Sequence, residues 1–341
     1  MRGKPAIIEI AKALNLSRNT VSKVINNKEG VSPKTKNLIL EYIASGDVPG
    51  RASPVSSPVS QPQKYVVFTY HHENAEYFND VLANAETALK ARGYSLLLNV
   101  IRDNTTDNIQ VPPGLYDGSA CGVISFNIFD EKYWEEIIAL NIPSVFIDTF
   151  YNPYMFVNKT DIITVESASA IHNLVTRFIA KGATSFGFAG SNHYCYSMFQ
   201  RWFYLKLTLE ENNLTLDENK CILNMDAFDK PDAILCIKEL LKQMDTIPEV
   251  FICANDLCAI ITSKALQELG YVIPDDVSIV GFNNSSEAQR QIPPLSTVDA
   301  HPDLIGQTSA QMLIDRINNP ALPHKFVMNQ SDVILRNSTS L

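Results

Sequence analysis

The first 45 residues alternate short apolar stripes with polar turns in a pattern that predicts helices. Ile7, Ile10, Ala11 and Leu14 recur at intervals of three and four residues, the spacing of one buried helical face. Asn15 interrupts this stripe, and asparagine tolerates the left-handed backbone that a sharp turn requires. We therefore expect a helix, a tight turn and a second helix.

The second helix is expected to begin after Ser17, a residue type that commonly caps a helix N-terminus. Val21, Val24 and Ile25 share one face of this helix. The opposite face holds phosphate- and base-binding types and no acid: Arg18, Asn19, Ser22 and Lys23. Two short helices in this arrangement describe a helix-turn-helix. The alternative is an amphipathic helical hairpin whose polar face meets only water.

A third helix and then a linker follow. Ser32 and Pro33 are an N-cap and a first helical position, and an apolar stripe continues to Tyr42. Residues 47–64 contain four prolines with interleaved serines, which cannot sustain a helix and favour extended, solvated backbone. The sequence therefore predicts a small helical head on a Pro/Ser-rich linker.

Beyond the linker, apolar runs typical of buried strands alternate with amphipathic helical stretches. The strand runs occupy residues 65–70, 94–100, 122–126, 144–148, 185–190, 249–253 and 277–282, and the helical stretches occupy 78–92, 131–140, 166–181, 196–212, 231–244 and 256–269. Such alternation predicts parallel doubly wound sheets, and the length suggests two of them. Ligands of such folds bind beyond the carboxyl ends of the strands, in the crevice between lobes.

The distribution of charge changes the interpretation of an acidic protein. The formal net charge is −9, but residues 1–64 hold ten Lys and Arg against four Asp and Glu. The head and linker therefore carry +6 and the remainder −15. A basic head on an acidic body directs a polyanion such as DNA to one end of the molecule.

Several classes of site lack a sequence signal. There is no charged-then-apolar leader and no apolar run long enough to cross a bilayer, so we expect a cytoplasmic protein with no membrane partner. The six cysteines show neither CxxC pairing nor metal-finger spacing, and several lie in apolar runs where a reduced thiol acts as a small hydrophobe. We expect no metal and no cofactor.

Three runs in the head, residues 10–12, 16–26 and 31–35, carry a family resemblance. With its specific Thr-Val-Ser-Lys-Val-Ile-Asn run, the chain resembles the LacI/GalR family of bacterial repressors. The resemblance implies that Arg18 and Asn19 probe base edges and that their neighbours contact phosphate or bases. The residues that we expect to contact DNA are Ser17, Arg18, Asn19, Thr20, Ser22, Lys23 and Asn26.

The resemblance extends through the core in runs at 253–259, 265–270, 272–282, 293–298 and 334–339. It implies a two-lobed core like that of periplasmic binding proteins, following the helix-turn-helix head. The domain boundaries expected are a head at 1–46, a linker at 47–64 and a core at 65–341. Within the core we expect an amino lobe of about 65–161 and 299–320 and a carboxy lobe of about 162–298 and 321–341.

This sequence departs from the family pattern in the linker and in the core. The linker lacks the pattern of the short hinge helix that family members form on operator DNA, so we interpret it as a loose tether. Tyr204 and Asn84 stand where glycine is usual, and Asn283 stands where aspartate is commoner.

Candidate effector-binding residues follow the predicted strands or match family positions. Tyr70, His72, Phe126, Asp148 and Phe228 are chosen by position, and such planar polar and aromatic groups suit a hydroxyl-rich ring. The resemblance adds Ser197, Arg201, Asn255 and Asn283.

Other interpretations of these segments stay open. His71 and His72 are weak metal candidates because neighbours on a strand point in opposite directions. An aromatic group either lines a sugar platform or packs a lobe: Tyr194, Tyr196, Phe199 and Trp202. Asp256 fits a simple helix cap.

The leading hypothesis is a repressor that binds double-stranded operator DNA as a homodimer, with a tetramer as the alternative. A small-molecule effector, expected to be a sugar or sugar derivative, would bind between the core lobes and change operator affinity. The rival is a sugar-processing or nucleotide-dependent α/β enzyme with a DNA-binding head, but no GxGxxG, GxxxxGK[ST] or nucleophile elbow is present. A transport-type binding protein is the third possibility, and the DNA head opposes it.

Overall fold

The computed structural model describes residues 7–26, 28, 30–45, 64–71, 75–101 and 111–341 of the chain. Its chain divides into two compact units, Met1–Pro62 and Gln63–Leu341. The fold class expected from the sequence is confirmed: a helical helix-turn-helix head and two α/β lobes with parallel sheets.

The head consists of three helices, α1 (Ile7–Ala13), α2 (Arg18–Ile25) and α3 (Pro33–Ser45). Asn15 adopts the left-handed backbone expected of the turn, with a φ of 52°. The helices enclose a small apolar core of Ile10, Ala11, Val21, Val24 and Ile39. This core explains the apolar spacing in the sequence, because each helix buries one stripe against the other two.

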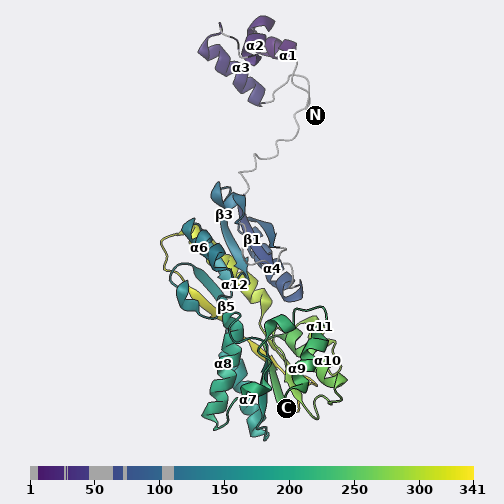
Figure 1. Ribbon diagram of the computed structural model, residues 1–341. Coiled ribbons are helices and arrows are strands. Elements are labelled where there is room, and N and C mark those ends of the chain that lie inside the picture. Colours follow the sequence, from purple (N-terminus) through teal and green to yellow (C-terminus); the bar gives the residue numbers. More distant parts are fainter. Residues whose placement is uncertain (1–6, 27, 29, 46–63, 72–74, 102–110) are drawn as a thin grey trace. The chain divides into compact units, whose positions relative to one another are not determined.

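The amino lobe is built on a six-stranded parallel sheet in the order β10-β5-β4-β3-β1-β2. The strands are β1 (Tyr65–His71), β2 (Ser95–Ile101), β3 (Ala120–Phe126), β4 (Ser144–Ile147), β5 (Asp161–Val165) and β10 (Phe326–Asn329). Helices α4 (Ala75–Lys90), α5 (Pro113–Tyr116), α6 (Glu131–Ala139), α12 (Pro302–Asn318) and the short η1 (Pro153–Met155) complete this lobe (Figure 1).

Both faces of this sheet are covered, so its strands are apolar almost throughout. Val66 and Phe68 face a core shared with α4 and α12, whereas Val67 packs with α5 and α6 on the other side. Gly306 permits the close approach of α12 to α4, because a Cβ there would overlap the carbonyl oxygen of Val81. The continuous apolar runs in the sequence follow from this two-sided burial.

The carboxy lobe is built on a three-stranded parallel sheet in the order β6-β7-β8. Its strands are β6 (Phe186–Ala189), β7 (Val250–Cys253) and β8 (Ser278–Val280). Its helices are α7 (Ala168–Ala180), α8 (Tyr196–Glu211), α9 (Ala233–Lys242), α10 (Asp256–Glu268) and α11 (Ser286–Gln289), with short η2 (Glu218–Lys220) and η3 (Met225–Ala227). Figure 1 shows α7 and α8 on one side of this lobe and α9 and α10 on the other.

The chain passes between the lobes at three places. It leaves the six-stranded sheet after β5, returns through β9 (Thr297–Asp299), and leaves again between β10 and β11 (Asp332–Ile334). The strands β9 and β11 pair with each other in an antiparallel ladder. A cleft lies between the two lobes that these connections join, and both lobes contribute residues to it.

The lobe boundaries differ from those expected. The family resemblance predicts that the first amino-lobe segment ends near 161 and that 321–341 belong to the carboxy lobe. In the structure β5 continues to Val165 and β10 pairs with it, so 326–329 belong to the amino-lobe sheet. The apolar part of β10, Phe326 to Met328, is only three residues long, and the strand lies half-exposed at a sheet edge. The linker expected at 47–64 lies, apart from Lys64, outside the described residues.

Within the described part of the chain, no helix combines the length and apolar character needed to cross a membrane.

Candidate DNA-binding surface and effector cleft

Ser17 caps the start of α2. Its hydroxyl oxygen accepts a hydrogen bond from the Thr20 backbone N–H at 3.0 Å, and the two hydroxyl oxygens lie 2.8 Å apart. This is the N-cap arrangement expected from the sequence, and it satisfies one of the free N–H groups at the helix start. Ser17 and Thr20 therefore already have structural partners within the head.

Arg18 and Asn19 occupy the exposed first turn of α2. Among the described residues, neither side chain has a hydrogen-bond or ion-pair partner. Val21 and Val24 on the opposite side are buried, but Ile25, which we had grouped with them, is 36% exposed at the helix end. The first turn of α2 thus presents a guanidinium and an amide with free hydrogen-bonding capacity.

The remaining predicted DNA contacts lie along the same helix. The Asn26 amide donates hydrogen bonds to the backbone oxygen of Ser22 at 2.9 Å and to its hydroxyl at 3.3 Å. The Lys23 ammonium lies beside Gly30 in the following loop. The structure therefore brings all seven predicted residues together on α2 and its two caps. The side chains of Arg18 and Asn19 have no hydrogen-bond partner among the described residues.

A cavity of about 390 Å³ lies between the two core lobes. Its amino-lobe walls come from the carboxyl ends of β1, β3, β4 and β5, where doubly wound folds bind ligands. Its carboxy-lobe walls come from the starts of α8 and α10, from η3 and from the end of β8. Six of the predicted effector residues line it: Phe126, Asp148, Ser197, Arg201, Asn255 and Asn283.

Asp148 links the two lobes directly. It is buried at the end of β4 with a left-handed φ of 63°. Its Oδ2 accepts a hydrogen bond from the Ser197 hydroxyl at 2.6 Å, and its Oδ1 accepts from the Ser197 backbone N–H at 3.3 Å. The next residue also crosses the cleft, because the Tyr196 N–H donates to the Thr149 carbonyl at 2.8 Å. The amino lobe thus holds the N-terminus of α8 through two consecutive residues.

Arg201 is buried one turn further along α8. Its guanidinium donates hydrogen bonds to the Ala254 carbonyl and to the Ser167 hydroxyl, and it lies 3.5 Å from the centre of the Phe282 ring. Burial lowers the pKa of Arg201, while nearby charges such as that of Asp148 favour the charged form. The arginine is therefore rigidly placed at the cavity wall.

The two asparagines of the carboxy lobe have distinct local roles. Asn255 caps α10, its side-chain oxygen accepting from the Cys258 N–H at 2.9 Å. Asn283 has a φ of 108°, and its backbone N–H donates to the Val298 carbonyl at 2.8 Å. Asp256, interpreted above as a simple cap, instead accepts from the Thr297 hydroxyl and the Ser285 N–H, both at 2.6 Å. It ties α10 to the segment after β8.

Two predicted residues lie away from the cavity. Tyr70 stacks on Phe78 with ring centres 3.8 Å apart, and Phe228 is buried in the carboxy-lobe core. Their neighbours line the cavity instead: His71 after Tyr70, and Asp229 after Phe228. Adjacent residues of an extended strand point in opposite directions, which explains why His71 lines the cavity while Tyr70 packs. His72 lies outside the described residues.

Of the four aromatic residues considered as a sugar platform, one lines the cavity and three pack elsewhere. Tyr194 lines the cavity, edge-to-face with Phe129 at 5.4 Å. Tyr196 packs near Phe326, while Phe199 and Trp202 pack with each other along α8 outside the cavity.

Several residues that line the cavity were not predicted from the sequence. Tyr77 and Ile305 come from the first turns of α4 and α12, and Met225 and Asp226 come from η3. Nothing in the sequence indicates that the starts of α4 and α12 face a cleft, and η3 has no periodic pattern. Asn127 also lines the cavity, and it directly follows β3, a position at which ligand contacts are expected from the sequence.

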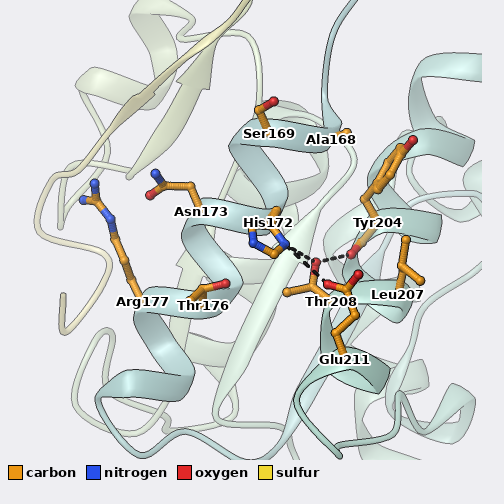
Figure 2. Close-up of a pocket in the computed structure, with 10 residues that line it drawn as sticks. All are labelled: Ala168, Ser169, His172, Asn173, Thr176, Arg177, Tyr204, Leu207, Thr208 and Glu211. Atoms are coloured by element: carbon orange, nitrogen blue, oxygen red, sulfur yellow. Dashed lines mark hydrogen bonds and ion pairs between the residues drawn. The ribbon is translucent and has the colours of Figure 1, made fainter.

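A second hollow of about 560 Å³ lies between α7 and α8 (Figure 2). Figure 2 shows His172 reaching toward α8, where its Nδ1 lies 3.3 Å from the Thr208 hydroxyl and 3.7 Å from the Glu211 carboxylate. The α7 side chains around it belong to the solvent-exposed face of that helix. Although larger, this groove is open and lies away from strand ends, so the interlobe cavity is the stronger candidate for an effector site.

The described residues contain no cluster of three or more His, Cys, Asp or Glu that could hold a metal ion. All six cysteines are free, and burial raises the pKa of Cys195, which lines the cavity. A thiol in that state is a poor nucleophile.

Two family models match the chain. Residues 6–46 match bacterial regulatory proteins of the lacI family, and residues 175–339 match a periplasmic binding protein-like domain. The first match covers the helix-turn-helix head, and the second covers most of the carboxy lobe and the return through the amino lobe.

Full-length similarity supports both matches. The chain is 30% identical to the HTH-type transcriptional regulator GalR of Lacticaseibacillus casei, over 98% of this chain and 99% of that protein. A solved complex of the transcriptional regulator CelR with cellobiose has a similar fold, with a TM-score of 0.71 at 20% identity, covering 98% of this chain and 99% of that chain. The lac repressor dimer bound to operator and the anti-inducer ONPF has a TM-score of 0.67 at 18% identity, with 99% of each chain covered.

Proposed function

Because this chain belongs to the LacI family of bacterial transcription regulators, we propose that it is a cytoplasmic repressor that binds operator DNA through its head. Members of this family regulate transcription and are not enzymes. In this proposal a small molecule in the interlobe cavity changes the affinity of the protein for its operator.

The observation that carries the DNA-binding proposal is the first turn of α2. Arg18 and Asn19 are exposed there without partners among the described residues, at the start of the second helix of a helix-turn-helix. In that motif the N-terminal residues of the second helix contact base edges in the major groove. Arginine suits the acceptor pair of guanine and asparagine suits adenine. The other predicted contacts, Ser17, Thr20, Ser22, Lys23 and Asn26, would hold phosphates or flanking bases.

The proposed effector is a carbohydrate or a related hydroxyl-rich molecule. The cavity combines amides, carboxylates and a hydroxyl with aromatic rings, which suit hydroxyl groups and the apolar faces of sugar rings respectively. The CelR–cellobiose complex, a structure of similar fold, supports this choice.

The proposed coupling runs through the contact of Asp148 with Ser197. This pair crosses the cleft and also lines the cavity, so a ligand that competes for either group changes how the lobes are held together. A ligand shifts such an equilibrium only by its differential affinity for the two arrangements.

A homodimer is the proposed assembly, because one symmetric pair of heads matches a near-palindromic operator. In the described core, Leu97 and Leu98 lie on the edge strand β2 and are 51% and 45% exposed, so this sheet edge is the proposed contact between the two cores.

Selection from a random duplex library with the full-length protein tests this function. We expect enrichment of one sequence with approximate two-fold symmetry, since two heads would read two half-sites. The double substitution Arg18→Ala with Asn19→Ala is the matched control, because both side chains are exposed and their removal leaves the head core intact. Failure of the unaltered protein to enrich any sequence would contradict the proposal.

A further inference from the structure

Two large apolar side chains stand at the solvent-exposed rim of the interlobe cavity. Tyr194 is 49% exposed and Leu257 is 45% exposed, and both line the cavity from the carboxy lobe. The other exposed lining residues of the described chain are two aspartates, Asp226 and Asp229. The groups that suit ligand hydroxyls are buried or half-buried: Asp148, Ser197, Asn255 and Asn283. Polar groups thus lie inside the cavity, while part of its rim is apolar.

The two apolar side chains come from neighbouring strand ends of one sheet. Strands β6 and β7 pair in parallel, so the segments that follow them, which carry Tyr194 and Leu257, leave the same edge of the sheet. Met225, which lines the cavity half-buried, follows Ile222, and Ile222 forms a bridge with Ala189 at the end of β6. Apolar side chains therefore follow three adjacent segments at this edge. A scattered exposed leucine needs no explanation, but neighbouring apolar residues around a cavity are typical of a binding surface.

Polar groups, and not these two side chains, fix the local backbone. The Ser191 hydroxyl accepts hydrogen bonds from the backbone N–H groups of His193 at 3.3 Å and Tyr194 at 3.2 Å. The start of α10 is held by the side chain of Asn255. Neither Tyr194 nor Leu257 belongs to the apolar cores of the described residues. Packing in a core therefore does not account for an apolar residue at either position.

Tyr194 also contacts the opposite lobe. Its ring lies edge-to-face with that of Phe129, with ring centres 5.4 Å apart and an angle of 77° between the planes. Phe129 lines the cavity half-buried and makes a second edge-to-face contact with Phe150 at 6.3 Å. Aromatic rings from both lobes therefore line this part of the cavity, and about half of the Tyr194 surface stays exposed.

We propose that Tyr194 and Leu257 form an apolar subsite, and that the effector is a sugar whose second ring or apolar substituent lies on it. The proposal rests on the proposed function and narrows its ligand class. The sugar hydroxyls bind the polar groups inside the cavity, and the second group covers the two exposed side chains. Burial of apolar surface and contact with an aromatic ring both favour this mode of binding. A free monosaccharide held by the polar groups leaves the subsite uncovered.

Thermal denaturation of the full-length protein with matched ligands tests the subsite. Glucose and galactose are each compared with their methyl and phenyl glycosides, in both anomers, and with the disaccharides cellobiose, maltose, lactose and melibiose. A ligand that binds the folded state raises the melting temperature, and the concentration dependence of this rise gives its affinity.

We expect a phenyl glycoside or a disaccharide to bind at least about tenfold more tightly than its free sugar, the low end of the range for one methylene group in an apolar pocket. Preference for the phenyl glycoside identifies an apolar substituent, and preference for the disaccharide identifies a second sugar ring. Equal affinities of the free sugars and their derivatives would overturn the proposal.

Substitution assigns the preference to these side chains. In Tyr194→Ala combined with Leu257→Ala, the ratio of derivative to free-sugar affinity should lose most of this advantage, whereas Tyr194→Phe keeps the ring and should retain it. Tyr151→Ala combined with Leu235→Ala is the matched control, because both residues are exposed to a similar degree and neither lines the cavity. An unchanged ratio in the Tyr194 and Leu257 double variant would overturn the assignment, because a contact that only holds the lobes together affects all ligands alike.

A protein that selects a DNA sequence yet is stabilised by no member of the series would also overturn this ligand class, with the DNA-binding function left standing. Loss of sequence-selective DNA binding would contradict the proposed function instead. The two failures are therefore distinguishable in one preparation.

Discussion

The head and the interlobe cleft present their proposed binding residues in opposite ways. In the head, Arg18 and Asn19 are exposed and have no partners among the described residues. In the cleft, Asp148 and Arg201 are buried and already bonded to protein groups. The head thus offers free hydrogen-bonding groups to a partner, whereas a ligand in the cleft would have to exchange existing bonds for new ones. Such an exchange would couple ligand binding to the contacts that hold the two lobes together.

Replacement of Arg201 by alanine should give the largest effect and tests the cleft side of this contrast. It removes bonds to Ala254 and Ser167 and the contact with Phe282, leaving a buried carbonyl unpaired. We expect a loss of about 3 kcal/mol in the free energy of unfolding, measured with urea. The response of DNA binding to an effector should also disappear.

Arg201→Lys is the control for this change, because lysine keeps the charge but not the planar fork of donors. DNA affinity measured without effector should stay unchanged in both variants. An alanine variant that keeps full stability and a normal effector response would show that the buried contacts of Arg201 do not matter as the structure suggests.

Replacement of Arg18 or Asn19 by alanine tests the head side. Since neither side chain packs or bonds among the described residues of the head, stability should change by less than about 0.5 kcal/mol. Specific DNA binding should weaken by roughly 1–3 kcal/mol, with relaxed preference at one base position. Competition against operator variants changed one base pair at a time measures this. An unaltered base preference would contradict the assignment of these residues as readers.

The sequence predicted the elements that local patterns define and missed those that depend on distant pairing. The periodicity of residues 7–45 and the buried-strand runs anticipated the three head helices and most of the parallel strands. Four strands were not predicted: β5, β9, β10 and β11. The last three are only three or four residues long, and the pairing of β9 with β11 depends on distant partners such as Asp299 with Asp332. Local patterns do not encode such pairings.

A local rule sufficed to place some of the candidate residues at the cavity. Asp148 directly follows β4, so its place there could be inferred from the strand, whereas Asn255 lies two residues after β7 and was inferred from the family resemblance. Tyr70 was chosen where His71 lines the cavity, because the direction of a side chain at a strand end depends on packing with α4. Asp226 comes from an irregular segment that only the folded chain brings to the cleft.

Ser17 has two expected roles, because it caps α2 and also lies on the expected DNA surface. Ser17→Ala should cost the head about 1 kcal/mol, the usual value of a lost N-cap. Ser17→Asp keeps a cap and suits the helix dipole, but it adds a negative charge where phosphate is expected. Thermal melting and DNA binding of both variants separate the roles. If the aspartate variant binds DNA normally, Ser17 acts only as a cap.

The smallest expected effect concerns the linker, which lies outside the described residues. Its prolines at 49, 54, 58 and 62 each disfavour a helix by about 3 kcal/mol relative to alanine. We therefore expect no gain of amide protection in residues 48–62 when operator DNA is added, measured by hydrogen exchange of the full-length protein. Replacing Pro54 and Pro58 by alanine removes the strongest barrier and provides the comparison. Clear protection in the unaltered chain would mean that the linker folds on DNA, and head and core would then be coupled by a formed element instead of a loose tether.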